Sequence, residues 1–252
     1  MKSEASNWRY AIVIPARYQS SRFPGKPLAD ILGKVMVERV WEQCCKAVAA
    51  ELVYIATDSK LIRDKCLGFG AQVVMTSSSC LTGTDRLAEA NEQLNCDFLI
   101  NVQGDEPIIE PNDILKVLRQ FQQVGNVTNA YCRINSESEF RSLTVPKVVF
   151  SQSKKLKYMS RSPIPITKSG GFSIAHKQVC IYAFSREQLK FFADHKQKTP
   201  LEAVEDIEIL RFLEADIPVD MVEVDSGSIA VDIPSDVNNV IEFLKNCDDR
   251  LT

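Results

Sequence analysis

The sequence predicts an α/β domain built on a mostly parallel sheet, and three observations support this class. The 252 residues include 45% hydrophobic and 25% charged residues, which is the usage of a folded globular chain. In the first half, apolar runs of strand length alternate with segments whose apolar residues repeat at helical spacing. The runs are continuously apolar, which is typical of strands that are buried on both faces. We therefore expect one domain over residues 1–252, with helices on both sides of a parallel sheet.

Four strands are predicted in the first half, over residues 10–15, 52–56, 71–75 and 98–102. Apolar residues at helical spacing predict helices over 36–48 and 61–67. Asp58 is the expected N-cap of the second helix, which should end at Gly68 and Gly70.

The second half is less regular. A polar turn between two apolar runs predicts a hairpin of residues 145–150 and 156–160, and 178–184 is a further predicted strand. The segment 163–173 is rich in Pro, Gly and Ser, and is expected to be a mobile loop beside the site or an interface. Helices are predicted over 186–192, 204–213 and 237–244.

Composition excludes several classes of protein. The net charge of -3 argues against a nucleic-acid binder that depends on phosphate contacts. No apolar run approaches the length of a membrane span, so membrane insertion is not expected. The eight cysteines form no CxxC pair, and we expect free thiols in a reducing cytoplasm. The two histidines, His176 and His195, are interpreted as surface residues.

A loop with three basic residues and three prolines follows the first predicted strand. Residues 15–28, PARYQSSRFPGKPL, carry Arg17, Arg22 and Lys26. Ligands of open α/β sheets bind beyond the carboxyl ends of the strands, where this loop emerges. Gly25 permits a close backbone approach, and the prolines stiffen the path. The loop matches neither GxxxxGK[ST] nor GxGxxG, so we predict a triphosphate site of another kind, with a solvated basic loop as the alternative.

Two carboxylates are predicted to lie near this loop. Asp105 follows a glycine in NVQGDEP at the end of the fourth strand, and Asp232 precedes the last helix in AVDIPSD. A carboxylate that faces bound phosphates is repelled unless a divalent cation lies between them, and Mg²⁺ favours carboxylate and phosphate oxygens. We therefore predict a Mg²⁺ site at these two residues, although a Gly-Asp pair is often only a turn.

Two further motifs are less specific. CLTGTDR, residues 80–86, places Gly83 and two threonines at a helix start, where backbone amides suit an anion or the edge of a base. An ordinary N-cap with a surface Arg86 explains this spacing nearly as well. In YMSRSPIP, residues 158–165, Arg161 follows a strand and would in isolation be a surface arginine.

Taken in order, the motifs resemble those of 3-deoxy-manno-octulosonate cytidylyltransferases, the CMP-Kdo synthetases. The resemblance spans residues 11–240 and is carried by PARYQSSRFPGKPL, TGTDR, NVQGDEP, PKVVF, YMSRSPIP, CIYAF, PLEAVEDIEILR and VDIPSDV. It implies a Rossmann-like nucleotide-diphosphosugar transferase fold and a homodimer, with a small antiparallel dimerisation sub-lobe over about residues 135–200. It also implies that CTP and a 3-deoxy ulosonic acid (Kdo or a Kdo-like sugar) give a CMP-sugar and pyrophosphate, with Mg²⁺, for lipopolysaccharide or capsule synthesis.

The resemblance assigns roles to individual residues. The catalytic residues would be Arg17, Lys26, Asp105 and Asp232, with the two aspartates as Mg²⁺ ligands. The nucleotide would be bound by Pro15, Ala16, Arg17, Arg22, Lys26, Thr82, Gly83, Thr84, Arg86, Gln103 and Asp105. The sugar acid would be bound by Gln103, Arg161, Gln178, Tyr182, Glu208, Ile209 and Asp232. Positioning and charge neutralisation would accelerate attack by the anomeric hydroxyl on the α-phosphorus, with no covalent enzyme intermediate.

Some positions depart from the family pattern. Cys80 and Gln178 stand where the family usually has histidine, Ala183–Phe184 stand where it has Gly-Tyr, and Ile209 replaces a sugar-facing glutamine. An unpaired buried polar group costs roughly 1–3 kcal/mol, so a sugar hydroxyl that lost its partner would bind less well. Because these changes gather where the sugar acid should bind, we predict an unchanged reaction class but a preference for a modified 3-deoxy ulosonic acid over Kdo.

Three alternatives remain at this stage. The chain could be a cytidylyltransferase for another ulosonic acid, such as 8-amino-Kdo or a sialic-acid-like sugar. A glycosyltransferase of related fold would need a DxD metal motif, which NVQGDEP does not supply. A non-catalytic nucleotide-binding paralogue would have no reason to keep Lys26, Asp105 and Asp232 together.

Overall fold

The computed structural model describes residues 8–20, 22–225 and 228–248. Within these residues, the main sheet has nine strands and a short hairpin lies apart from it. The strands of the main sheet are β1 (Tyr10–Pro15), β4 (Val53–Thr57), β5 (Gln72–Met75), β6 (Phe98–Val102), β7 (Val127–Arg133), β8 (Lys147–Phe150), β9 (Leu156–Ser160), β10 (His176–Ser185) and β11 (Val219–Glu223). The separate hairpin is β2 (Asp30–Ile31) with β3 (Lys34–Val35).

The order of the strands is β11-β7-β10-β6-β1-β4-β5, and most of these neighbours are parallel. β1 pairs in parallel with both β4 and β6, β4 with β5, and β7 with β11. The exception is β10, which runs antiparallel between β6 and β7. β8 and β9 add a small antiparallel extension beyond β10. The predicted α/β class with a mainly parallel sheet and a small antiparallel part is confirmed.

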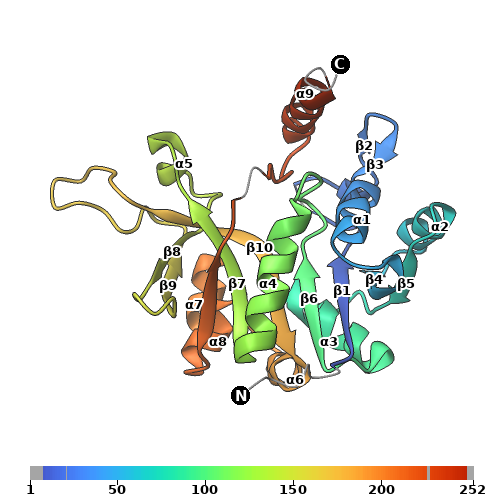
Figure 1. Cartoon of the computed structure of the whole chain (residues 1–252), viewed down its shortest axis with the longest axis horizontal. Coiled ribbons are helices and arrows are strands. Elements are labelled where there is room, and N and C mark those ends of the chain that lie inside the picture. Colours follow the sequence, from blue (N-terminus) through green and yellow to red (C-terminus); the bar gives the residue numbers. More distant parts are fainter. Residues whose placement is uncertain (1–7, 21, 226–227, 249–252) are drawn as a thin grey trace.

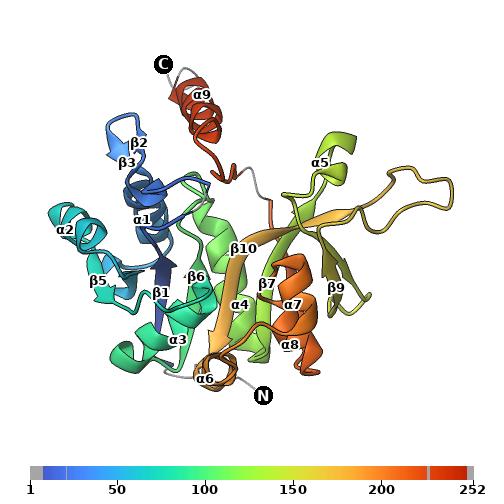
Figure 2. The same ribbon diagram turned by 180° about the vertical axis from the view of Figure 1, so that it is seen from behind.

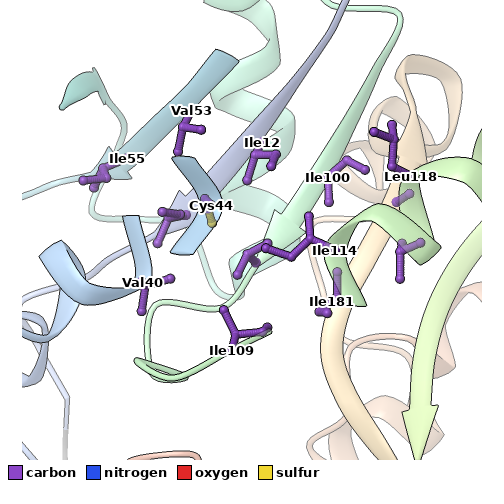
Figure 3. Close-up of a cluster of buried hydrophobic side chains, with 14 of the residues drawn as sticks. Ile12, Val40, Cys44, Val53, Ile55, Ile100, Ile109, Ile114, Leu118 and Ile181 are labelled. Carbon is purple, nitrogen blue, oxygen red and sulfur yellow. The ribbon is translucent and has the colours of Figure 1, made fainter. Parts of the chain in front are cut away.

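Helices cover both faces of the sheet (Figures 1 and 2). The helices are α1 (Met36–Ala47), α2 (Lys60–Gly68), α3 (Gly83–Leu94), α4 (Pro111–Val124), α5 (Glu137–Arg141), α6 (Arg186–Asp194), α7 (Pro200–Glu205), α8 (Leu210–Glu214) and α9 (Asp236–Asp248), with 3-10 turns at Lys26–Leu28 and Ala50–Leu52. α1, α2 and α4 enclose one apolar core, part of which Figure 3 shows, and α3, α6 and α8 enclose the other.

Several elements differ from the sequence prediction. The helix predicted over 204–213 is two short helices, because Asp206 adopts a left-handed conformation with φ 52° and ends α7. The N-cap of α2 is Ser59, whose hydroxyl accepts from the Ile62 amide, and not Asp58. The strands β7 and β11 and the amphipathic helix α4 were not predicted, although α4 buries Ile114 and its neighbours at regular helical spacing.

The strand order reverses direction between β1 and β6. From β1 the chain proceeds to β4 and β5 on one side, and then returns to β6 on the other side of β1. Open α/β sheets bind ligands in the crevice outside the carboxyl ends of the strands at such a reversal. The loops that follow β1 and β6 therefore define the expected site. No helix in the described ranges has the length and apolar character needed to span a bilayer.

Candidate active site

A pocket opens where the sheet reverses, between the loops that follow β1 and β6 and the start of α3. Eleven residues that the sequence placed at the nucleotide, metal or sugar sites line it: Pro15, Ala16, Arg17, Arg22, Lys26, Thr82, Gly83, Arg86, Gln103, Asp105 and Asp232. These residues come from four separate stretches of the chain, which the parallel strands bring to one edge of the sheet. Four motifs that are far apart in sequence thus form one concave surface.

Glycines allow the pocket's walls to approach one another. A Cβ atom on Gly104 would lie 2.9 Å from the carbonyl oxygen of Pro15, so the loops after β1 and β6 are in backbone contact there. A Cβ atom on Gly83 would lie 2.9 Å from Nε2 of Gln103. The Gln103 side chain can therefore rest against the beginning of α3 only because residue 83 is glycine.

Lys26 lines the pocket and is held there by two acceptors. Gly25 adopts φ 72°, a left-handed conformation that starts the short turn carrying Lys26. The Lys26 ammonium donates to Asp105 Oδ2 and to the Val231 carbonyl oxygen, at 2.8 Å each. The Val231 amide donates in turn to the Asp105 carbonyl oxygen at 2.8 Å. This arrangement ties the segment before α9 to the loop after β6.

A second ion pair spans the same pocket. Arg22 lies 3.0 Å from Asp232, and both side chains are solvent-accessible, with exposures of 60% and 33%. The pocket thus contains two carboxylates, each neutralised by a basic residue of the loop after β1. No group of three or more potential metal ligands occurs in the described part of the chain. Mg²⁺ usually takes only one or two carboxylates together with substrate phosphates, so Asp105 and Asp232 fit this ion in the presence of a triphosphate.

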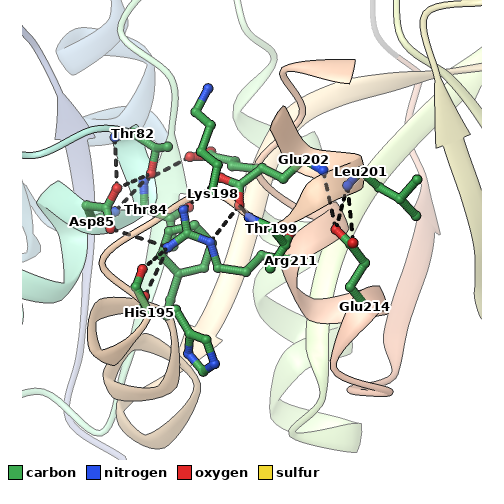
Figure 4. A network of polar contacts seen from close by, with 12 residues as sticks. Thr82, Thr84, Asp85, His195, Lys198, Thr199, Leu201, Glu202, Arg211 and Glu214 are labelled. Carbon is green, nitrogen blue, oxygen red and sulfur yellow. Dashed lines mark hydrogen bonds and ion pairs between the residues drawn. The ribbon is translucent and has the colours of Figure 1, made fainter. Parts of the chain in front are cut away.

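The start of α3 forms the next wall of the pocket. Thr82 and Asp85 cap this helix reciprocally, with each side chain accepting from the other residue's backbone amide (Figure 4). Arg86 is only 3% exposed, and its guanidinium is held by Thr76 and Asp58. Arg86 therefore contributes a fixed positive wall, and is not the surface arginine that the alternative interpretation required.

Glu208 extends the site from the nucleotide side toward β10. One of its carboxylate oxygens accepts from the Thr84 amide at 3.1 Å, and the other lies 3.5 Å from Gln103 Nε2. Burial raises the pKa of the Glu208 carboxyl, although hydrogen bonds from Thr84 and Thr82 favour its ionised form. The buried Tyr182 phenol lies nearby, and burial also raises its pKa well above the ordinary value. Glu208 is partly exposed and supplies a polar surface beside the pocket, whereas Tyr182 is only 3% exposed.

Arg161 contacts the end of α7, shortly before Glu208 in the chain, and Gln178 contacts Tyr182. The guanidinium of Arg161 donates to the carbonyl oxygens of Leu143, Glu205 and Asp206, and so fixes the end of α7. The Gln178 amide donates to Tyr182. Neither of these residues lines the pocket between β1 and β6.

Ile209 has a different position from the one that the sequence suggested. Its side chain is 0% exposed and packs in the core shared with α3 and α6. A side chain in this position presents no surface to a ligand, so Ile209 makes no contact with the pocket. The predicted preference for a modified sugar loses its main support.

The sequence analysis missed several residues of the pocket and misplaced one histidine. Ser20, Pro27, Cys80, Leu81 and Gly104 also line the pocket. All five lie inside the motifs that were singled out, so the motif boundaries already contained them. His176 is half-buried between Tyr131 and Phe150 and is not a surface residue, whereas His195 is exposed.

Cys80 does not supply a nucleophile. Its thiol donates to Glu89, and burial together with this carboxylate raises its pKa to about 12. The thiolate is the reactive form of cysteine, so the side chain is inert near neutral pH.

The pocket as a whole presents cations, carboxylates and the backbone amides of a helix start. These groups suit the binding and neutralisation of a polyanion.

Comparison with known proteins agrees with this chemistry. The sequence model of the cytidylyltransferase family matches residues 11–221. A 3-deoxy-manno-octulosonate cytidylyltransferase of Myxococcus xanthus is 41% identical over 94% of this chain and 97% of its own length. A mitochondrial protein of the same name from Arabidopsis thaliana is 37% identical, over 97% of this chain and 86% of its own.

A solved structure has the same fold. The structure of a CMP:2-keto-3-deoxy-manno-octonic acid synthetase complexed with CTP superposes with a TM-score of 0.87 at 34% identity, covering 94% of this chain and 99% of the other. The sequence and structural similarities both extend over nearly the whole chain. We conclude that the protein belongs to the 3-deoxy-manno-octulosonate cytidylyltransferase family of CTP-dependent enzymes.

Proposed function

We propose that the protein couples CTP to Kdo, giving CMP-Kdo and pyrophosphate, in the pocket between β1 and β6. The observation that carries this proposal is the pairing of two basic residues with two carboxylates at the reversal point of the sheet. The matched relatives are named for Kdo, and none of the findings favours 8-amino-Kdo or a sialic-acid-like sugar instead. Kdo is therefore the substrate that we propose.

The chain's own residues would act mainly by positioning. Arg17, Arg22 and Lys26 would contact the triphosphate, while the Thr82–Gly83 turn and Gln103 would lie against the cytidine. In the reaction, the anomeric oxygen of Kdo forms a bond to the α-phosphorus, and the bond to the bridging oxygen of the β-phosphate breaks. The hydroxyl proton is released to water, and pyrophosphate leaves. The cations around the triphosphate would stabilise the charge that develops on the leaving group.

Asp105 and Asp232 would hold Mg²⁺ together with the triphosphate. When bound, the ion would neutralise phosphate charge and lower the pKa of the attacking hydroxyl. Lys26 and Arg22 now occupy these two carboxylates, so both cations would have to move to the phosphates when the ion binds. Before substrate binds, Lys26 and Arg22 neutralise the two carboxylates.

The proposal also includes a setting for the enzyme. We propose a homodimer, supported by large exposed apolar side chains around the antiparallel part of the molecule: Leu143, Ile166, Ile174 and Val204. The eight free cysteines support a reducing compartment such as the cytoplasm. The product would serve lipopolysaccharide or capsule synthesis. Light scattering of the purified protein tests the dimer, because a monomeric mass would contradict it.

A pyrophosphate-release assay tests the reaction. We expect release with CTP and Kdo in the presence of Mg²⁺, a weaker response to the other nucleoside triphosphates, and none in excess EDTA. Undiminished release in EDTA would contradict the metal assignment. Release that does not depend on any sugar acid would contradict the transfer reaction itself.

Two variants test the pocket directly. Lys26→Ala and Asp105→Ala should each lower kcat by at least a hundredfold, because each removes a charge that the transition state needs, typically about 3 kcal/mol. The exposed pair Lys190 and Asp194 on α6 is a matched control, since these two side chains form a similar ion pair far from the pocket. Lys190→Ala and Asp194→Ala should keep wild-type kcat. Near wild-type kcat for Asp105→Ala would place the metal elsewhere.

A further inference from the structure

Strand β10 has an irregularity beside the site, and one buried side chain fills it. Val179 pairs with Ala130 of β7, but the next paired residue on β10 is Tyr182, opposite Asn129. Cys180 and Ile181 therefore bulge out of the ladder with β7. The Asn129 side chain is completely buried and donates through Nδ2 to the carbonyl oxygens of Val179 and Ile181, at 3.0 Å each. Bulges are common next to active sites, where they redirect side chains.

These two bonds fix the orientation of the Asn129 carboxamide. Carbonyl oxygens only accept hydrogen bonds, so the NH₂ group of Asn129 must face them, and its Oδ1 must face the other way. Oδ1 lies 3.2 Å from Nε2 of Gln178. An amide oxygen requires a donor, so the NH₂ group of Gln178 must point toward Asn129.

The orientation of the Asn129 carboxamide fixes that of the Gln178 carboxamide. Its Nε2 also donates to the Tyr182 hydroxyl at 3.0 Å, so both amide hydrogens of Gln178 are used. Its Oε1 accepts no hydrogen bond from any residue that the structure describes, and the side chain is half-buried. The Gln178 oxygen is thus the acceptor that remains available.

Backbone hydrogen bonds connect this part of β10 to the loop that lines the pocket. The Cys180 carbonyl oxygen accepts from the Gln103 amide at 3.2 Å, so the bulge is joined to the loop that lines the pocket. On its other side, the Cys180 amide donates to the buried carboxylate of Glu106, the residue after Asp105. The charge of nearby Glu208 contributes to the raised pKa of the Tyr182 phenol.

We propose that Asn129 is a positioning residue that holds the Gln178 carboxamide with its oxygen free to accept a hydrogen bond from a hydroxyl of the sugar acid. This inference rests on the proposed function for the identity of the ligand. The orientation of Gln178 itself depends only on the contacts within the chain. A sugar with a hydroxyl at this position gains a hydrogen bond, and one with an acceptor group there is disfavoured.

Steady-state kinetics separate this role from a merely structural one. Asn129→Ala should raise the KM for Kdo by about tenfold and change the KM for CTP by less than about twofold, because only the sugar side loses an oriented partner. In a Gln178→Ala background, Asn129→Ala should have no further effect on the KM for Kdo, because the side chain that it positions is absent. Equal rises in both KM values, or additive effects of the two substitutions, would overturn the proposal.

Asn91→Ala is the matched control for lost stability. Asn91 is also buried and makes two hydrogen bonds to the backbone of Cys96, but it lies toward the far end of α3. It should leave both KM values unchanged. A rise in the KM for Kdo in Asn91→Ala equal to that in Asn129→Ala would mean that general destabilisation is the cause.

If Asn129→Ala does not fold, a measurement on the ligand-free wild-type protein still tests the orientation of Gln178. In the wild-type protein, both side-chain amide hydrogens of Gln178 should exchange with solvent more slowly than those of an exposed glutamine, as measured by NMR. Exchange of either hydrogen at the free rate would overturn the proposal. Absence of turnover in the wild type would instead count against the proposed function, and leaves this exchange test unaffected.

Discussion

The backbone at Gly104 and the carbonyl oxygen of Pro15 lie so close that only a residue without a Cβ atom fits between them. This contact joins the loop that carries Arg17 and Lys26 to the loop that carries Asp105. The spacing between cations and carboxylates in the pocket therefore depends on one missing methyl group.

Gly104→Ala tests this dependence. The added Cβ would lie 2.9 Å from backbone, which cannot rotate away, so the two loops must separate. We expect a loss of stability of about 1–3 kcal/mol, and a fall in kcat of tenfold or more from misplacement of the loops. Gly68→Ala at the end of α2 is the control, because nothing lies within 4 Å of its Cβ position. Wild-type kcat in Gly104→Ala would show that the contact is not needed for the site.

At the residue scale, the sequence predicted the charged residues of the pocket better than the residues that orient other side chains. Lys26 and Asp105 were found because each follows a strand that ends at the ligand edge of a parallel sheet. Ile209 was placed at the sugar by resemblance, but its burial depends on the packing of α8, which no local pattern reveals. Asn129 carries no motif, because its role arises from a bulge on another strand.

At the scale of elements, a buried ion pair holds four helices together beside the site. Arg211 of α8 and Glu202 of α7 are both 0% exposed, and the guanidinium meets the carboxylate through two bonds of 2.7 Å. Arg211 also donates to the carbonyl oxygens of Phe192 and His195, at the end of α6, and lies 3.6 Å from Asp85 on α3 (Figure 4). The start of α3, which lines the pocket, is thereby linked to α6, α7 and α8.

Glu202→Ala should destabilise the protein by about 3–5 kcal/mol, because it leaves a buried guanidinium without its carboxylate. Urea denaturation followed by circular dichroism measures this change. Asp194→Ala breaks an exposed pair and should stay within about 1 kcal/mol of the wild type. Equal midpoints for Glu202→Ala and the wild type would contradict the stabilising role of the pair.

A second contact between elements is sensitive to pH. Glu205, at the end of α7, accepts from the Arg161 amide and from the hydroxyls of Ser160 and Tyr158. Burial alone would raise its pKa, but these hydrogen bonds outweigh burial and lower it. A carboxyl whose folded pKa is depressed adds stability above its unfolded pKa of about 4.3, and this stability is lost as the pH falls through the folded value.

Glu205→Gln should therefore lower Tm at pH 7, and the difference from the wild type should shrink as the pH falls below about 4. Thermal melts at a series of pH values measure both effects. Exposed Glu187 on α6 provides a control, since Glu187→Gln should show a smaller and flatter difference. A Tm difference for Glu205→Gln that stays constant down to acid pH would rule out the ionised carboxylate as the source of stability.

Elements with a strong local signal were predicted, and those set by tertiary context were not. The strands β1 and β6 were predicted to the residue, because each is a continuous apolar run with clear boundaries. Apolar residues do repeat at helical spacing over 204–213, yet the helix is interrupted at Asp206. The interruption occurs because the Arg161 side chain binds the carbonyl oxygens of Glu205 and Asp206. That break depends on an arginine 45 residues away in sequence.

At the scale of the whole molecule, the sheet topology explains how one pocket gathers residues from across the chain. Lys26 and Val231 are separated by 205 residues, yet they are joined by a hydrogen bond at the carboxyl ends of β1 and β6. The segment before α9 lies over this edge of the sheet in Figure 1 and brings Asp232 to Arg22. The order of the strands, and not any single motif, therefore brings the basic residues and the carboxylates of the pocket together.

The most direct test of the central claim is a ³¹P NMR spectrum of the protein mixed with CTP, Kdo and Mg²⁺. The account predicts that the three CTP signals disappear while equal amounts of a phosphodiester signal, for CMP-Kdo, and of pyrophosphate appear. Lys26→Ala in the same mixture should leave CTP largely unchanged over the same period. Cleavage of CTP to CDP and inorganic phosphate, or CTP that persists with the wild-type protein, would contradict the account.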